Sequence, residues 1–331
     1  MKQFIIKIFR FSLPVFLVIN SVIYIDFFKI FGFQDYYSTQ EVSVNRGMIT
    51  STTFNHYREI ENFDSFIFGS SRSQAFKCKN WIHYLDENTK PFHFDASNEN
   101  IWGLTKKVEY IDELKDTIKN ALVIIDRTTL VGTSPIDGHL FISTPIISKS
   151  SKIEYYLTFL KASLNLKFLT AYIDYSIFKT YRSYMGTFIK KSKYSKIANN
   201  KNCDIWYGLD KEIEYDSLGY YTKKVEEGVF YPRTRVYKSE CNVTLKEINQ
   251  LKKIKNIFKK HNTKYGIIIS PTYDQLEMEK SQIELLEEIF GEENIYNFSG
   301  ENEFTENIYN FYEDSHYRPN IANKIMELIY N

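Results

Sequence analysis

Two short stretches near opposite ends of the chain carry side chains that could perform nucleophilic chemistry together. The first is Gly69-Ser70-Ser71, which directly follows a short apolar run at residues 65–68. This pattern predicts a strand that ends in a tight turn before a helix. A serine in such a turn is lifted off the sheet edge, and the N-terminus of a helix favours developing negative charge. We therefore predict that Ser71 is a nucleophile.

The second stretch is Glu313-Asp314-Ser315-His316, which lies just before a predicted terminal helix. A serine nucleophile needs a base to take its proton, and that base needs an acid to fix its tautomer. His316 is the predicted general base. Glu313, three residues before the histidine, and Asp314, one residue closer, are both candidates for the acid.

The elements around these stretches alternate between strands and helices. Apolar runs predict strands, and three- and four-residue apolar spacings predict helices. Such alternation implies a parallel sheet that is covered on both faces, and ligands of such sheets bind at the carboxyl ends of the strands, where Ser71 and His316 are both expected. Strands are predicted at 65–68, 91–97, 121–125, 265–270 and 294–298, and helices at 104–119, 245–258, 281–291 and 319–329.

The two stretches resemble the sequence blocks of the SGNH/GDSL-type hydrolases, in the membrane-anchored branch associated with acylation of cell-surface glycans. Gly69-Ser70-Ser71 is similar to the first block, usually Gly-Asp-Ser, and Glu313 to His316 is similar to the last, usually Asp-x-x-His. The resemblance covers residues 60–130 and 262–331. It implies a three-layer, flavodoxin-like α/β fold with a parallel sheet.

The middle blocks of the family are where the chain departs from it. The second block usually supplies an oxyanion-hole glycine, and here the corresponding residues are Ser97 and Asn98. The third is often Gly-x-Asn-Asp, and no such string occurs. Backbone or side-chain donors at Ser97 and Asn98, with positive charge from Arg72 and Arg127, are therefore the candidate oxyanion or substrate-binding groups. A plain turn at 97–98 and a surface ion pair at Arg127 are the structural alternatives.

The resemblance implies an extracytoplasmic serine esterase or O-acyltransferase that acts on acyl esters, acetyl esters foremost, of a cell-envelope polysaccharide. Its partners would be that glycan or acyl-ester substrate and a membrane acyl-donor protein, and it would need no metal or organic cofactor. The alternative is a catalytically degenerate component that binds carbohydrate or assists assembly. A lipid-directed esterase also fits a membrane location, but no residue of its own supports it.

The N-terminal residues carry the targeting signal. Lys2, Lys7 and Arg10 precede an uncharged run at residues 11–25, which predicts a retained transmembrane anchor over residues 1–33. The positive-inside rule then places the N-terminus in the cytoplasm and the rest in the periplasm. Residues 34–60 are interpreted as a connector and 61–331 as the α/β domain. An aromatic-rich insertion at about 140–243 is expected to form amphipathic helices that act as a lid or a partner surface.

Charge and cysteine content narrow the remaining possibilities. The formal net charge is +1, so nothing in the overall balance indicates a nucleic-acid partner. The three cysteines have no close spacing that would form a familiar metal site. Outside the cytoplasm Cys203 and Cys241 are predicted to form a disulfide, which would leave Cys78 unpaired.

Overall fold

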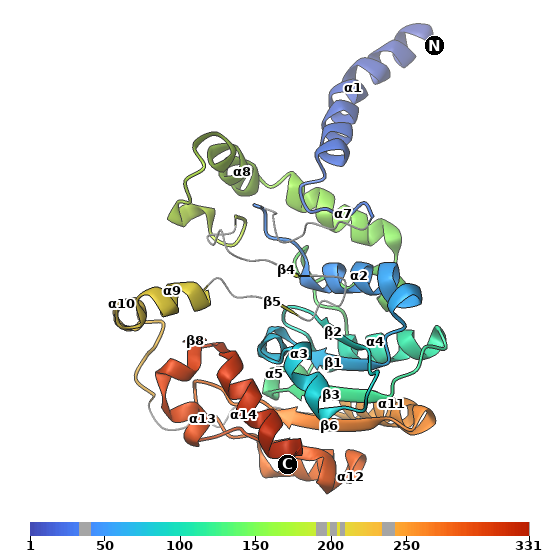
Figure 1. Cartoon of the computed structure of the whole chain (residues 1–331). Coiled ribbons are helices and arrows are strands. Elements are labelled where there is room, and N and C mark those ends of the chain that lie inside the picture. The colour runs from blue at the N-terminus through green and yellow to red at the C-terminus, as the bar shows by residue number, and fades with distance from the viewer. Residues whose placement is uncertain (33–40, 190–196, 199–203, 206–208, 234–241, 331) are drawn as a thin grey trace.

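A five-stranded parallel sheet forms the centre of the protein (Figure 1). The computed structural model describes the whole chain apart from residues 33–40, 190–196, 199–203, 206–208, 234–241 and 331. The spatial order of the strands is β2-β1-β3-β6-β7, and every neighbouring pair is parallel. The strands are β1 (Ser65–Gly69), β2 (Pro91–Asp95), β3 (Asn120–Ile125), β6 (Lys264–Ile269) and β7 (Ile295–Asn297).

The strand order is compatible with a flavodoxin-like fold. From β1 the chain moves first to one side, to β2, and then back across to β3 on the other side. The connections that leave β1 and β3 therefore diverge over opposite faces of the sheet and open a crevice at the carboxyl ends of these strands. Ser71 lies two residues beyond the end of β1, at this switch point.

The sheet forms because its strands are apolar on both faces. Side chains of β1, β3 and β6 alternate between two separate hydrophobic cores, as a parallel sheet buried on both sides requires. One face packs against α2 (Arg46–Glu61), α4 (Ile101–Glu113), α11 (Leu245–His261) and α12 (Lys280–Phe290). The other face packs against η2 (Ser71–Ala75), α3 (Cys78–Trp81) and α14 (Pro319–Tyr330).

The insertion divides into two helical pairs. The first pair, α7 (Lys152–Ser163) and α8 (Leu166–Phe178), builds a third core with Phe27 and Phe28, which follow α1 (Lys2–Ile25). The second pair, α9 (Leu209–Tyr215) and α10 (Ser217–Glu226), packs into the core that contains α14. The remaining elements are α5 (Arg127–Leu130), α6 (Pro145–Ser148), α13 (Glu303–Glu306), η3 (Ile82–Tyr84), η4 (Ser183–Met185), η5 (Glu292–Asn294), η6 (Ile308–Asn310), β4 (Ile197–Ala198), β5 (Asp204–Ile205), β8 (Phe311–Glu313) and β9 (His316–Tyr317).

The predicted N-terminal transmembrane helix is not found. Residues Lys2–Ile25 do form a helix, α1, but among the described residues no helix is long and apolar enough to cross a membrane. The uncharged run at 11–25 has fifteen residues, whereas a spanning helix needs about twenty.

Two further expectations need correction. The segment interpreted as a connector contains α2, whose Phe54 is fully buried against the sheet, so its second half belongs to the α/β core. Cys78, expected to be unpaired, is disulfide-bonded. The predicted Cys203–Cys241 pair lies outside the described residues.

Candidate active site

The turn after β1 presents Ser71 at the start of η2. Gly69 makes this turn possible because a Cβ atom there would lie 2.8 Å from the Ile124 carbonyl oxygen and 2.8 Å from the Cβ of Ser73. Both distances are too short for real side chains, so only glycine lets β1 approach β3 and η2 this closely. The chain then turns at once, and the Ser73 N–H donates to the Ser70 carbonyl at 3.0 Å. Ser71 is left half-buried at the rim of the sheet.

The histidine from the far end of the chain contacts this serine. His316 opens β9, which pairs antiparallel with β8, and Glu313 and His316 are partners across this hairpin. The Nε2 atom of His316 lies 2.7 Å from Ser71 Oγ, and its Nδ1 atom contacts Glu313 Oε1. In the arrangement that satisfies both contacts, the Ser71 hydroxyl donates to Nε2 while Nδ1–H donates to the carboxylate. Serine, imidazole and carboxylate thus form a continuous hydrogen-bonded chain.

The two candidate acids have different surroundings. Burial works to raise the pKa of Glu313, but its hydrogen bond to His316 and the charge of that imidazole lower the pKa below the ordinary value. Asp314 instead accepts a hydrogen bond from the Ser315 hydroxyl at 3.0 Å. Burial and the neighbouring Glu313 charge raise the pKa of Asp314. Glu313 is therefore the carboxylate that stays ionised beside the imidazole.

A buried polar network lies beneath the Ser71 turn, and the sequence did not reveal it. Asp95, at the end of β2, receives the Arg46 guanidinium in a two-pronged contact at 2.8 and 2.9 Å. It also accepts from Gln74 Nε2 at 2.8 Å, which ties η2 to β2 and α2. Burial works to raise the pKa of Asp95, yet the Arg46 charge outweighs it and the pKa falls to about 2. Arg46 lies in the supposed connector, where no strong helical period drew attention to it.

A hydrogen bond between Ser73 and His93 also holds this turn in place. The Ser73 hydroxyl donates to the Ser70 carbonyl at 2.7 Å, so it is left to accept from Nε2 of His93 at 2.9 Å. Complete burial lowers the pKa of His93 to about 4. The imidazole is therefore neutral at physiological pH and serves as a fixed hydrogen-bond donor.

The two arginines predicted to bind substrate are both held in ion pairs. Arg72 Nη1 lies 2.6 Å from the carboxylate of Asp126, which is buried at the end of β3. Burial works to raise the pKa of Asp126, but the Arg72 charge and the Thr128 and Thr129 donors lower it. Arg127 Nη2 lies 3.0 Å from the carboxylate of Asp274. An ion pair was the sequence-based alternative to a substrate-binding role for Arg127. Arg72 thus links the turn after β1 to the end of β3.

The predicted oxyanion residues follow β2 at the same edge of the sheet. The strand end is attached to β1, because Ala96 N donates to the Gly69 carbonyl at 3.3 Å. Asn98 is exposed and has a left-handed φ of 54°, typical of asparagine in a tight turn. The oxyanion role of Ser97 and Asn98 remains a prediction.

The second half of the insertion holds the histidine hairpin in place. From α10, the Tyr220 hydroxyl donates to the Tyr312 carbonyl at 2.7 Å and the Tyr221 hydroxyl donates to the Phe311 carbonyl at 2.8 Å. Both acceptors lie on β8, next to Glu313. The tyrosines were visible in the sequence only as part of an aromatic-rich segment, and no local pattern paired them with a hairpin about ninety residues away.

Comparison with other proteins adds no assignment. No protein-family model matches the chain, and a search of curated proteins found no match. Within the described ranges, no group of three or more histidine, cysteine, aspartate or glutamate side chains is placed to hold a metal ion.

Proposed function

We propose that the protein is an SGNH-type serine esterase or O-acyltransferase that acts on acyl esters of a cell-envelope polysaccharide. The observation that carries this proposal is the contact of Ser71 Oγ with His316 Nε2 at 2.7 Å, with Glu313 on the other ring nitrogen. These residues are 245 positions apart, so local packing does not explain the arrangement. Acyl transfer through a serine requires a nucleophile that is hydrogen-bonded to a base, and a base that is hydrogen-bonded to an acid.

The proposed reaction proceeds through an acyl-enzyme. His316 Nε2 takes the Ser71 proton as Oγ attacks the ester carbonyl, and Glu313 stabilises the imidazolium that results. The tetrahedral intermediate collapses, the sugar oxygen leaves, and His316 returns the proton to it. Water or another sugar hydroxyl, deprotonated by His316, then attacks the acyl-enzyme and releases Ser71. Water gives hydrolysis and a hydroxyl gives transfer, from the same three residues.

An extracytoplasmic location is part of this proposal. The Cys78 disulfide supports it, because disulfides persist in oxidising compartments and are rare in the cytosol. A glycan of the cell envelope and a membrane protein that delivers acyl groups are the partners that this location would supply.

The mechanism is tested with a fluorophosphonate probe and a small acyl ester. Because Ser71 supplies the attacking oxygen, Ser71→Ala should abolish covalent labelling and lower kcat by about a thousandfold or more. Ser70→Ala is the matched control, since the buried Ser70 hydroxyl has no hydrogen-bond partner among the described residues. Labelling that persists in Ser71→Ala, or is lost only in Ser70→Ala, contradicts the proposal.

The second candidate is a degenerate component that binds glycan without turnover. Its support is that Arg72 and Arg127 are engaged in ion pairs and that the third-block asparagine is missing. This candidate predicts no labelling of the wild-type protein, together with glycan binding that survives Ser71→Ala. Measuring both properties on the same preparation separates the two functions.

A further inference from the structure

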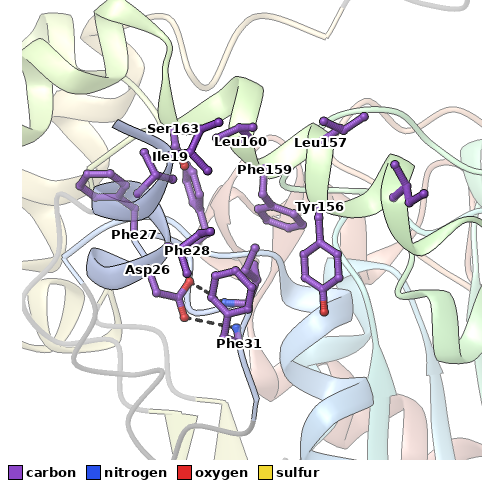
Figure 2. A pocket seen from close by; sticks show the side chains of 14 residues that line it. Ile19, Asp26, Phe27, Phe28, Phe31, Tyr156, Leu157, Phe159, Leu160 and Ser163 are labelled. Atoms are coloured by element: carbon purple, nitrogen blue, oxygen red, sulfur yellow. Dashed lines mark hydrogen bonds between the residues drawn. The ribbon is translucent and has the colours of Figure 1, made fainter. Parts of the chain in front are cut away.

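A cavity lined by apolar side chains lies between the end of α1 and α7 (Figure 2). Its volume is about 330 Å³, within the range of about 300–1,000 Å³ of small-ligand sites. Ile19 and Phe31 contribute from the N-terminal segment, and Leu157 and Leu160 from α7. Among the lining residues that the structure describes, Asp26 alone is charged, and its two carboxylate oxygens accept the backbone N–H groups of Ile30 and Phe31, at 2.9 and 3.2 Å. The walls therefore favour an aliphatic ligand over a polar one.

Helix α8, which packs against α7, is apolar on its outer face as well. In α8, Phe168 and Ala171 are buried in the core shared with α7, whereas Leu166, Ile173 and Ile177 on the other side are 79%, 55% and 66% exposed. An exposed apolar stripe of this kind on a helix is suited to a partner or to lipid. In α7, Ile153 and Leu157 are exposed at the cavity. Figure 1 shows α7 and α8 at the end of the molecule from which α1 projects.

The charged residues of these helices indicate what kind of surface they would contact. Helices α7 and α8 carry three lysines and two acidic residues, and α1 adds three basic residues and no acidic one, although the whole chain has a formal charge of only +1. Lys152, Lys161 and Lys167 are exposed on α7 and α8. Asp174, one of the two acids, already pairs with Arg182 at 2.9 Å, and Glu154 is the other. Apolar side chains among exposed lysines match the acyl region and the headgroups of an anionic lipid surface.

We infer that α7 and α8 form a membrane-contacting face, and that the cavity beside α1 accepts an acyl chain of an anionic phospholipid. This surface assigns a role to the first half of the insertion, which would face the bilayer while its second half holds the histidine hairpin. The inference is independent of the proposed esterase activity, because no residue of the site around Ser71 lines the cavity.

The test uses the full chain with vesicles of phosphatidylcholine and phosphatidylglycerol whose acyl chains are brominated, because bromine quenches tryptophan inside the apolar layer. Leu157→Trp puts a probe at the cavity mouth. Leu328→Trp is the matched control, since Leu328 is similarly exposed but on α14, far from α1 in Figure 1. The wild type, with its three native tryptophans, gives the background quenching. Above that background, quenching in Leu157→Trp should be at least about three times that in Leu328→Trp.

Two further variants keep the outcome clear. Ile177→Trp, on the outer face of α8, gives a second probe position if Leu157→Trp fails to fold. Replacing Lys152, Lys161 and Lys167 with glutamine should weaken vesicle binding by about tenfold or more, and vesicles without phosphatidylglycerol should do the same. Equal quenching at the cavity and at Leu328 overturns the inference. So does light scattering that shows a lipid-free dimer in which both probes are shielded, since a second copy would then cover this face.

Discussion

At the scale of single residues, the choice between the two carboxylates follows from the turn that joins β8 to β9. The hairpin brings Glu313 across from His316, whereas Asp314 lies in the connection and contacts Ser315. The position three residues before the histidine is therefore the one that reaches its Nδ1 atom.

We predict that Glu313→Gln and Asp314→Asn have unequal effects. The amide at 313 keeps the shape but removes the charge that stabilises the imidazolium, so kcat should fall by about a thousandfold or more. Asp314→Asn should change kcat only a few-fold, because the Asp314 carboxylate accepts from the Ser315 hydroxyl, whereas Glu313 contacts Nδ1 of the imidazole. Steady-state kinetics on a soluble acyl ester measures both. A large loss in Asp314→Asn alone would show that the assignment of the acid is wrong.

At the scale of elements, η2 is held by neighbours from both sides. Gln74 ties it to Asp95 at the end of β2, and Arg46 ties Asp95 to α2. Arg72 ties it to Asp126 at the end of β3. Because η2 has only five residues, its own hydrogen bonds give it little stability, and the Gln74 hydrogen bond and the Arg72 ion pair at the two neighbouring strand ends help to hold Ser71 in place.

Breaking the Arg46–Asp95 pair should be costly. Arg46→Met removes the guanidinium that neutralises the buried Asp95 carboxylate, and the free energy of unfolding should fall by about 3–5 kcal/mol. Arg58→Met, on the same helix, is the control. Arg58 pairs with Asp116 at 3.0 Å, but both side chains are partly exposed, so the loss should be about 1 kcal/mol or less.

Urea unfolding of the two variants measures this difference. The double variant Arg46→Met, Asp95→Leu should recover part of the stability, since it removes the buried negative charge together with the guanidinium that neutralised it. Equal losses for Arg46→Met and Arg58→Met would mean that the buried pair does not support the turn.

At the scale of the whole molecule, a long chain closes on itself around one sheet. The nucleophile candidate is residue 71 and the histidine is residue 316, and the four longer helices of the insertion form a pair near α1 and a pair beside the histidine hairpin. The insertion thus forms the apolar face of α7 and α8 and, through α10, contacts the hairpin that carries His316. The stability of this arrangement should depend on pH through His93, which is buried beside the Ser71 turn.

His93 should make the protein less stable in mild acid. Its pKa is about 4 in the folded protein and about 6.5 in an unfolded chain. The unfolded state therefore binds the proton first, so the free energy of unfolding should fall as pH drops from about 6.5 to about 4, by an order of 3 kcal/mol. Below pH 4 both states are protonated and this contribution no longer changes.

The measurement is urea unfolding at several pH values, with His93→Gln as the comparison. The glutamine amide keeps a hydrogen-bond donor near Ser73 but does not titrate, so the slope of stability between pH 5 and 6.5 should be shallower than in the wild type. Parallel slopes would show that His93 does not couple to folding.

The sequence alone determined the local features whose cause lies within a few residues. The predicted runs at 65–68, 121–125 and 265–269 are strands because both faces of a parallel sheet exclude water, and Thr244 and Glu247 form the capping box that starts α11. The sequence also predicted the turn that carries Ser71 and its proximity to His316, because the loops after parallel strands lie at one edge of the sheet.

Only the tertiary structure decided which distant groups meet. Arg46 and Asp95 are 49 residues apart, and Tyr220 and Tyr312 are 92 apart. Neither pair has a spacing that local periodicity can reveal. Their contacts depend on how α2 and α10 pack, since a buried charge or hydroxyl takes the partner that the fold places beside it.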